Sequence, residues 1–177
     1  MAKRNAPRQV TGRPRRRRWW PVVVGLLVVG GGVLGYFAYL AQASLPGTAV
    51  PSQGNRHIAS PAEPHEPYNT DPPTSGPHVP YLAPWGVHTR PIPPEVQVHN
   101  LEDGGVLVQY NCECPELVER LRRIVEDYPK YVILAPYPGM KSRIALTAWT
   151  RIDTFDEFDE RRIRRFIDAY RGIDHHR

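Results

Sequence analysis

The sequence lacks several short patterns that identify common activities. It has no Gly-x-Ser-x-Gly segment, so the nucleophile elbow of an α/β-hydrolase is excluded. Its two cysteines are spaced Cys-x-Cys, and the Cys-x-x-Cys of thioredoxin-like proteins is missing. No two histidines have the tight His-x-x-x-His spacing of zinc ligands on one helix. The spacing of the histidines is therefore only a weak signal for a metal site.

Acidic residues are missing from residues 1–20, which carry eight of the 23 basic residues. The other 157 residues hold 15 basic and 18 acidic side chains, so the high isoelectric point belongs to the amino-terminal arm. A basic patch on the folded part would be the electrostatic signature of a nucleic-acid-binding protein. We expect no nucleic-acid partner.

Charged side chains are also missing between Val22 and Ala41, a stretch long enough to cross a hydrocarbon layer of about 30 Å. We expect a cytoplasmic basic arm (1–20), a transmembrane helix (21–43) in contact with membrane lipid, and an extracytoplasmic remainder, because positive charge stays inside. The protein would then be a single-pass protein of the cell membrane. The alternative is a cleaved signal peptide, since Ala41-Gln42-Ala43 resembles a cleavage site.

The remainder divides into a linker (44–66), an exported domain (67–172) and a short tail (173–177). The linker is rich in proline, serine and glycine, and this composition continues to Pro94. A loop this long is uncommon unless it is disordered or functional. Apolar side chains such as Tyr68 and Trp85 would otherwise be left in water, so we expect an ordered arm packed on a sheet.

Hydrophobic periodicity predicts an α+β domain with the element order β-β-α-β-β-α. Alternation in VQVHN and the apolar run VLVQY predict a hairpin over residues 96–110. Leu117, Leu121, Ile124 and Val125 share one helical face. We further expect strands at residues 130–135 and 143–150 and a final helix near residues 156–171.

The Cys112 and Cys114 pair lies between a predicted strand and a predicted helix. Three interpretations remain open. The pair is a redox-active dithiol whose thiol pKa is lowered by the helix amino terminus, a soft metal site, or a structural disulfide of an oxidising compartment.

Five histidines lie before or within the first predicted hairpin: His57, His65, His78, His88 and His99. Three imidazoles and a carboxylate satisfy a tetrahedral zinc site, and imidazole also suits copper. The alternative is that they are loop histidines bonded to the backbone.

The segments YNTDPPTSGPH, WGV, VHNLEDGGVLVQYN, LAPYPGM and IALTAWTR, in this order, resemble a bacterial family of unknown function, DUF3105, over roughly residues 54–171. Members have one amino-terminal membrane span and an exported domain, and the resemblance implies no established activity. In the family pattern the hairpin motif reads Val-His-Asn-Leu-Glu-His-Gly, and Asp103 replaces its second histidine. The resemblance implies His57, His78, His99 and Asp103 as candidate metal ligands.

Asp103 favours zinc or another borderline ion over copper(I), because a carboxylate is a harder ligand than imidazole. It is equally consistent with a degenerate site. Two other functions stay open: a thiol-redox protein using Cys112 and Cys114, and a non-catalytic surface domain that binds an exported or membrane protein through Tyr81 and Trp85. No pattern identifies a reaction, so no catalytic residue is assigned.

Overall fold

Residues 19–43 and 45–176 are described by the structure, a computed structural model. The chain divides into two units, Met1–Ser44 and Leu45–Arg177. The expected basic arm lies, apart from Trp19 and Trp20, outside the described residues, as does Arg177 at the end of the tail.

The described part of the first unit is one helix, α1 (Trp20–Ala43). Its 24 residues extend for about 36 Å. Among the described residues it is the one helix long and apolar enough to cross a membrane, as a membrane span or a signal sequence would be. Its large side chains, including Leu26 and Leu34, are exposed.

The second unit is built on a six-stranded mixed sheet in the order β1-β6-β5-β3-β4-β2. Parallel pairs join β3 to β4 and β4 to β2, and the other neighbours are antiparallel. The fold is therefore α+β, as predicted. The elements are β1 (Thr48–Ala49), β2 (Gly86–Val87), α2 (Pro94–Glu102), β3 (Val106–Tyr110), α3 (Pro115–Glu126), β4 (Val132–Pro136), β5 (Ile144–Ala148), β6 (Arg151–Phe155) and α4 (Glu160–Tyr170).

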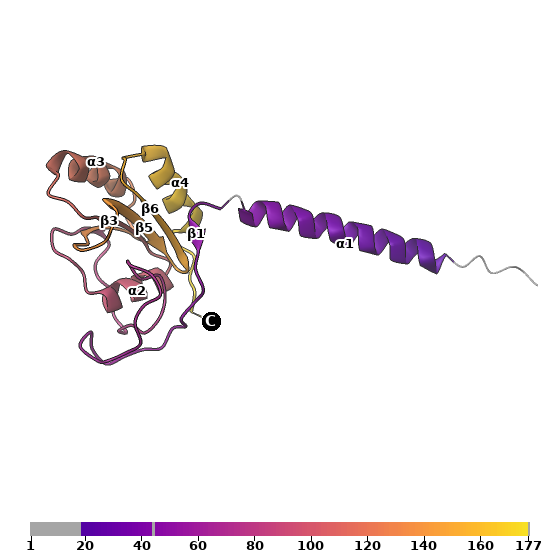
Figure 1. Ribbon diagram of the computed structural model, residues 1–177, viewed down its shortest axis with the longest axis horizontal. Helices are drawn as coiled ribbons and strands as arrows, with labels where there is room; N and C mark the ends of the chain where they lie inside the picture. Colours follow the sequence, from indigo (N-terminus) through magenta and orange to yellow (C-terminus); the bar gives the residue numbers. More distant parts are fainter. Residues whose placement is uncertain (1–18, 44, 177) are drawn as a thin grey trace, which may run out of the picture. The chain divides into compact units, whose positions relative to one another are not determined.

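Helices cover both faces of this sheet, α3 and α4 on one side and α2 on the other (Figure 1). Leu121 of α3 and Phe166 of α4 pack on the first face with Val108 and Leu146 of the strands. Leu101 of α2 packs on the second face with Leu107 and Ile133 and with residues from the segment before α2. Because successive strand residues point to opposite faces, each strand contributes to both cores.

The periodic part of the sequence folds as predicted. Leu117, Leu121, Ile124 and Val125 are the buried residues of α3, which connects the parallel strands β3 and β4. In β5, Ile144, Leu146 and Ala148 face the α3 and α4 core. The final helix begins at Glu160, later than expected, because Asp159 is its N-cap residue and accepts a hydrogen bond from the Arg162 N–H.

The predicted hairpin at residues 96–110 is wrong in its first half. Residues 94–102 form helix α2, and only the second half is a strand, β3. Two prolines explain why a helix begins here. Pro93 is the N-cap residue, and Pro94 occupies the first turn with a φ angle that already suits a helix. The alternation of Val96 and Val98 misled the prediction because every residue from Val96 to Glu102 is buried, so polarity does not reveal a period.

Residues 45–66, expected as a linker, belong to the second unit. Thr48 and Ala49 pair with β6 at the edge of the sheet, and His57 forms an isolated parallel bridge with His78. Composition could not reveal this, because the contacts are largely backbone hydrogen bonds, which almost any residue can make.

The Pro-rich arm (residues 67–94) is ordered, as predicted. Residues 72–79 are buried. Gly76 has a φ of 121°, and its missing Cβ leaves room for the Tyr68 ring, which would be 3.1 Å away. Trp85 is half-buried and packs on Tyr131 with ring centroids 5.4 Å apart, whereas Tyr81 is exposed. The arm packs beside α2 rather than on a hairpin.

Candidate metal centre

Helix α2 carries two polar side chains on one face, His99 and Glu102. Residues three apart on a helix are neighbours on its surface, and the His99 Nδ1 atom lies 3.8 Å from Glu102 Oε2. Both side chains are buried, Glu102 almost completely. The helix ends directly after Glu102, at Asp103 and the positive-φ residue Gly104.

Two extended segments bring His57 and His78 to the same place. The His78 N–H donates to Arg56 O at 3.0 Å, and the Ile58 N–H donates to His78 O at 2.8 Å. This pairing fixes the two imidazoles as neighbours, with ring centroids 4.9 Å apart. The rigid prolines of the arm and the freedom of Gly76 hold His78 in this position.

The hydrogen bonds of His78 determine which nitrogen carries its proton. His78 Nδ1 lies 2.8 Å from Gly76 O, and a carbonyl oxygen can only accept, so the proton is on Nδ1. In the neutral imidazole, Nε2 is therefore bare, and it faces Glu102 Oε2 at 2.9 Å. Two lone pairs at this distance repel unless a proton or a cation is between or beside them.

The Glu102 carboxylate lies at the centre of the group. Its Oε2 atom is also 3.9 Å from His57 Nε2. Its Oε1 atom and His99 Nδ1 are buried without a hydrogen-bond partner. Such buried polar atoms are rare and costly, and an ion is one of the standard explanations for them.

Burial is the main cause that lowers the pKa of His99, since it disfavours the charged imidazolium. The nearby Asp103 carboxylate acts in the opposite direction. His99 is therefore held in its neutral form, which is the form of imidazole that binds a metal ion.

These four side chains, His57, His78, His99 and Glu102, form a cluster whose ligand atoms all lie within 4.8 Å of one another. We call it the His3Glu cluster. Three His and one carboxylate are a ligand set that zinc accepts. His78 and Glu102 form the buried floor of the cluster, whereas the side chain of His57 is 50% exposed.

The family model described as "Protein of unknown function (DUF3105)" matches residues 61–176. The chain belongs to the DUF3105 family. No curated protein and no solved structure matches the chain. In this DUF3105 chain the matched segment includes His78, His99 and Glu102, and His57 lies just before it.

Of the four residues predicted as ligands in this DUF3105 chain, the structure brings together His57, His78 and His99. Asp103 is not in their cluster. It forms a second group with His99 and His176, again within 4.8 Å, and its side chain is partly exposed. The sequence did not predict Glu102 as a ligand, because the expected hairpin over residues 96–110 placed this residue in its turn. It did not predict His176 because this residue lies in the tail.

The other histidines of the DUF3105 domain have other partners. His65 lies 3.3 Å from Glu95 and 2.7 Å from Glu66 O. His88 Nε2 lies 2.7 Å from Pro84 O. These two are histidines bonded to neighbouring residues, as the alternative interpretation expected.

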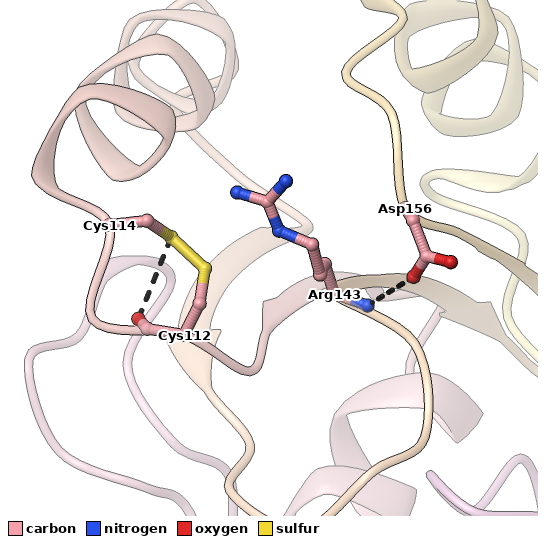
Figure 2. Close-up of a disulfide and its surroundings, with 4 residues drawn as sticks. All are labelled: Cys112, Cys114, Arg143 and Asp156. Carbon is pink, nitrogen blue, oxygen red and sulfur yellow. Dashed lines mark hydrogen bonds between the residues drawn. A yellow bond between two sulfur atoms is a disulfide. The ribbon is translucent and has the colours of Figure 1, made fainter.

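Cys112 and Cys114 form a disulfide in the DUF3105 domain, and neither belongs to the metal groups. The pair lies between β3 and α3 and packs on the α3 side of the sheet, whereas α2 covers the other face. Cys114 is the N-cap residue of α3. Figure 2 shows Arg143 between the disulfide and Asp156, which accepts a hydrogen bond from the Arg143 N–H at 2.9 Å. Soft metal ligation by this pair together with a histidine has no support in the structure.

Proposed function

We propose that the carboxy-terminal unit binds one divalent transition-metal ion through the His3Glu cluster. The observation that carries the proposal is the Glu102 carboxylate, buried with Oε1 unpartnered and with Oε2 2.9 Å from Nε2 of His78. A cation bound by both side chains would bridge the two atoms in place of a proton. A purely structural role would leave Glu102 Oε1 and His99 Nδ1 buried without partners.

The shape of the cluster fits an ion after small movements. With bonds of roughly 2.0–2.1 Å, neighbouring ligands of a tetrahedral zinc ion lie about 3.4 Å apart. All ligand atoms lie within 4.8 Å of one another, so the ligands would have to approach by at most about 1.4 Å. The half-exposed His57 is free to make this movement, whereas the buried His78 is held by Gly76 O.

Zinc is the ion that we assign first, with copper(II) as the competitor. Imidazole is a borderline ligand that suits both ions, whereas magnesium and calcium prefer oxygen ligands throughout. Copper(I) prefers thiolate and thioether ligands, and the cluster has none. The Nδ1–H of His78 bonded to a backbone carbonyl is the outer contact that metal-binding histidines usually make.

The test is zinc binding by the full-length, untagged chain in detergent, measured by competition with a chromophoric chelator. His57→Ala is the first variant because the side chain is half exposed and its loss should not affect folding. His88→Ala is the matched control, an imidazole outside the cluster. We expect His57→Ala to lose zinc affinity and His88→Ala to retain it. Equal affinity in both variants would refute the proposal.

We further propose that α1 is a retained anchor in the cell membrane, with the basic arm in the cytoplasm and the metal-binding unit outside. The Cys112–Cys114 disulfide supports a position of the metal-binding unit outside the cytoplasm, because disulfides persist in oxidising compartments. The mass of the protein isolated from membranes tests the anchor. A chain that includes residues 1–43 supports it, and a chain that begins at Ser44 shows a cleaved signal peptide.

We propose dithiol–disulfide exchange as a second function, favoured by the pocket beside the disulfide. The pocket has a volume of about 520 Å³, and Cys114, Leu117, Arg143 and Phe158 are among its lining residues. A thiolate of a partner protein would attack the Cys114 sulfur, and the disulfide would break with its electron pair on Cys112, which then takes a proton. A second partner thiol would release Cys114 and leave the partner with a disulfide. The partner dithiol is oxidised and the Cys112–Cys114 disulfide is reduced.

The amino terminus of α3 would support this reaction, because the helix dipole stabilises the Cys114 thiolate that is released. The test is the oxidation of a reduced dithiol peptide by the full chain. We expect one peptide disulfide formed for each chain and none with the Cys112→Ser/Cys114→Ser double variant. No oxidation by the wild-type chain would refute this function and would leave the metal proposal unaffected.

A further inference from the structure

The C-terminal tail (residues 173–177, described through His176) is docked against the end of α2. The Gly172 N–H donates to Gly104 O at 2.7 Å, and the His175 N–H donates to Glu102 O at 2.9 Å. Gly104 makes this docking possible, since a Cβ there would lie 2.7 Å from the backbone nitrogen of Ile173. The tail therefore reaches the same helical turn that carries the His3Glu cluster.

Docking places the His176 imidazole over the Glu102 carboxylate. His176 Nε2 lies 3.2 Å from Glu102 Oε2 and 3.3 Å from Asp103 Oδ1. Its ring is edge-on to His99, with centroids 6.0 Å apart. His175 does not enter the cluster and instead stacks on Trp149 at 5.9 Å.

The other nitrogen of His176 is fixed by the tail itself. His176 Nδ1 lies 2.8 Å from Asp174 Oδ1, and the His176 N–H donates to the same oxygen at 2.9 Å. A carboxylate only accepts, so Nδ1 carries the proton and Nε2 is directed at Glu102. His78 shows the same arrangement, with Nδ1 on an acceptor and Nε2 on Glu102. Histidines that bind a metal through one ring nitrogen usually donate the N–H of the other to a carboxylate or carbonyl oxygen, which fixes the orientation of the ring.

We propose that His176 is a further ligand of the same ion and that the bound ion holds the C-terminal tail against α2. We call the tail in this role the clasp. This inference rests on the proposed metal-binding function. His176 would make the ion five-coordinate, a coordination that zinc accepts. His176 groups with His99 within 4.8 Å but not with His57 and His78, so the tail must move closer to these two imidazoles when the ion binds.

The exposure of the ligands indicates the route of the ion. His78 and Glu102 are buried, while the side chains of His57 and His176 are 50% and 44% exposed. The ion would enter and leave on the side of these two imidazoles, and the tail would cover it after entry. Loss of His176 should therefore act mainly on the rate at which the ion leaves.

The test compares zinc release from the full-length chain to excess chelator in wild type, His176→Ala and a chain that ends at Ile173. We expect both variants to release zinc at least about tenfold faster than wild type. Loss of a single residue that supports a metal ligand already weakens metal binding by about this factor. His88→Ala is the control and should release zinc at the wild-type rate. Hydrogen exchange supplies a second measurement: zinc should slow exchange of the His175 and His176 amides.

The outcomes separate this inference from the function on which it rests. A wild-type chain that binds no zinc refutes the metal site and the clasp together. A wild-type chain that binds zinc, with release from His176→Ala at the wild-type rate and no zinc effect on tail exchange, refutes the clasp alone. The truncated chain keeps α2 and all four residues of the His3Glu cluster, so it remains able to bind zinc.

Discussion

Replacing Glu102 by glutamine separates the charge of this side chain from its shape. The substitution keeps the volume, so the buried site beside Leu101 and His78 does not acquire a cavity. An amide N–H can donate to Nε2 of a neutral His78, and this nitrogen lies 2.9 Å from a carboxylate oxygen in the wild type. We therefore expect the metal-free variant to unfold at the wild-type temperature or above it.

The loss of zinc affinity follows from the number of ligands. Structural zinc sites bind with about 10–16 kcal/mol, so a central value shared by four ligands gives about 3 kcal/mol for each. Removing one charged ligand should therefore weaken binding roughly a hundredfold. In wild type, zinc at about a thousand times its dissociation constant should stabilise the fold by about 4 kcal/mol, a rise of roughly 10–20 °C in Tm.

The assay is thermal unfolding of the full chain in detergent, with and without zinc, together with chelator competition. Glu95→Gln is a matched control, because it is the same substitution about two turns earlier on α2, at a residue paired with His65. At the same zinc concentration, about ten times the weakened dissociation constant, we expect the zinc-dependent rise in Tm to fall to about a third in Glu102→Gln and to persist in full in Glu95→Gln. A Glu102→Gln variant that keeps the rise would refute the role of the carboxylate. A metal-free Glu102→Gln variant that unfolds well below wild type would refute the repulsive geometry.

Two further predictions concern the fold that supports the site. Gly105→Ala should lower the free energy of unfolding in urea by about 1–3 kcal/mol. A Cβ at this position would overlap the Asn100 carbonyl oxygen and lie 2.9 Å from the Trp85 ring. An unchanged urea midpoint would contradict this packing. Leu121→Ala should lower the free energy of unfolding by about 2–5 kcal/mol, because Leu121 is fully buried on the inner face of α3. Arg123→Ala, on the exposed face of α3, should lower it by less than about 1 kcal/mol. Similar losses in both variants would contradict the assignment of the two faces.

Amphipathic periodicity was sufficient to predict helices α3 and α4 with their apolar faces, and the three strands β3, β4 and β5. The apolar positions of α3 repeat with the helical period, and the strands β3, β4 and β5 are apolar runs. Strands β1 and β2 contain two residues each, too few for any pattern. Their pairing follows from the tertiary structure and not from local sequence.

The site was predictable only in part, because the ligands of the His3Glu cluster come from three separate segments. Family resemblance indicated His57, His78 and His99, and the structure brings them together. Glu102 was missed through the error in α2, although Pro93 and Pro94 followed by Glu95 are typical of a helix start. On a helix, His99 and Glu102 share a face, so the correct element would have predicted the correct carboxylate.

His176 illustrates the limit of the sequence. It lies 77 positions after His99, in a tail with no apolar pattern. Its position depends on the Gly172–Gly104 hydrogen bond and on the missing Cβ of Gly104. A glycine in a turn motif does not reveal which distant segment passes over it.

Zinc content is the measurement that tests the central claim most directly. The untagged full-length chain would be stripped with chelator, exposed to a zinc buffer, desalted and analysed by plasma mass spectrometry beside His57→Ala and His88→Ala. The account predicts one zinc ion per chain in wild type and in His88→Ala, and a clear loss in His57→Ala. A wild-type chain that is folded by circular dichroism and retains no zinc would contradict it.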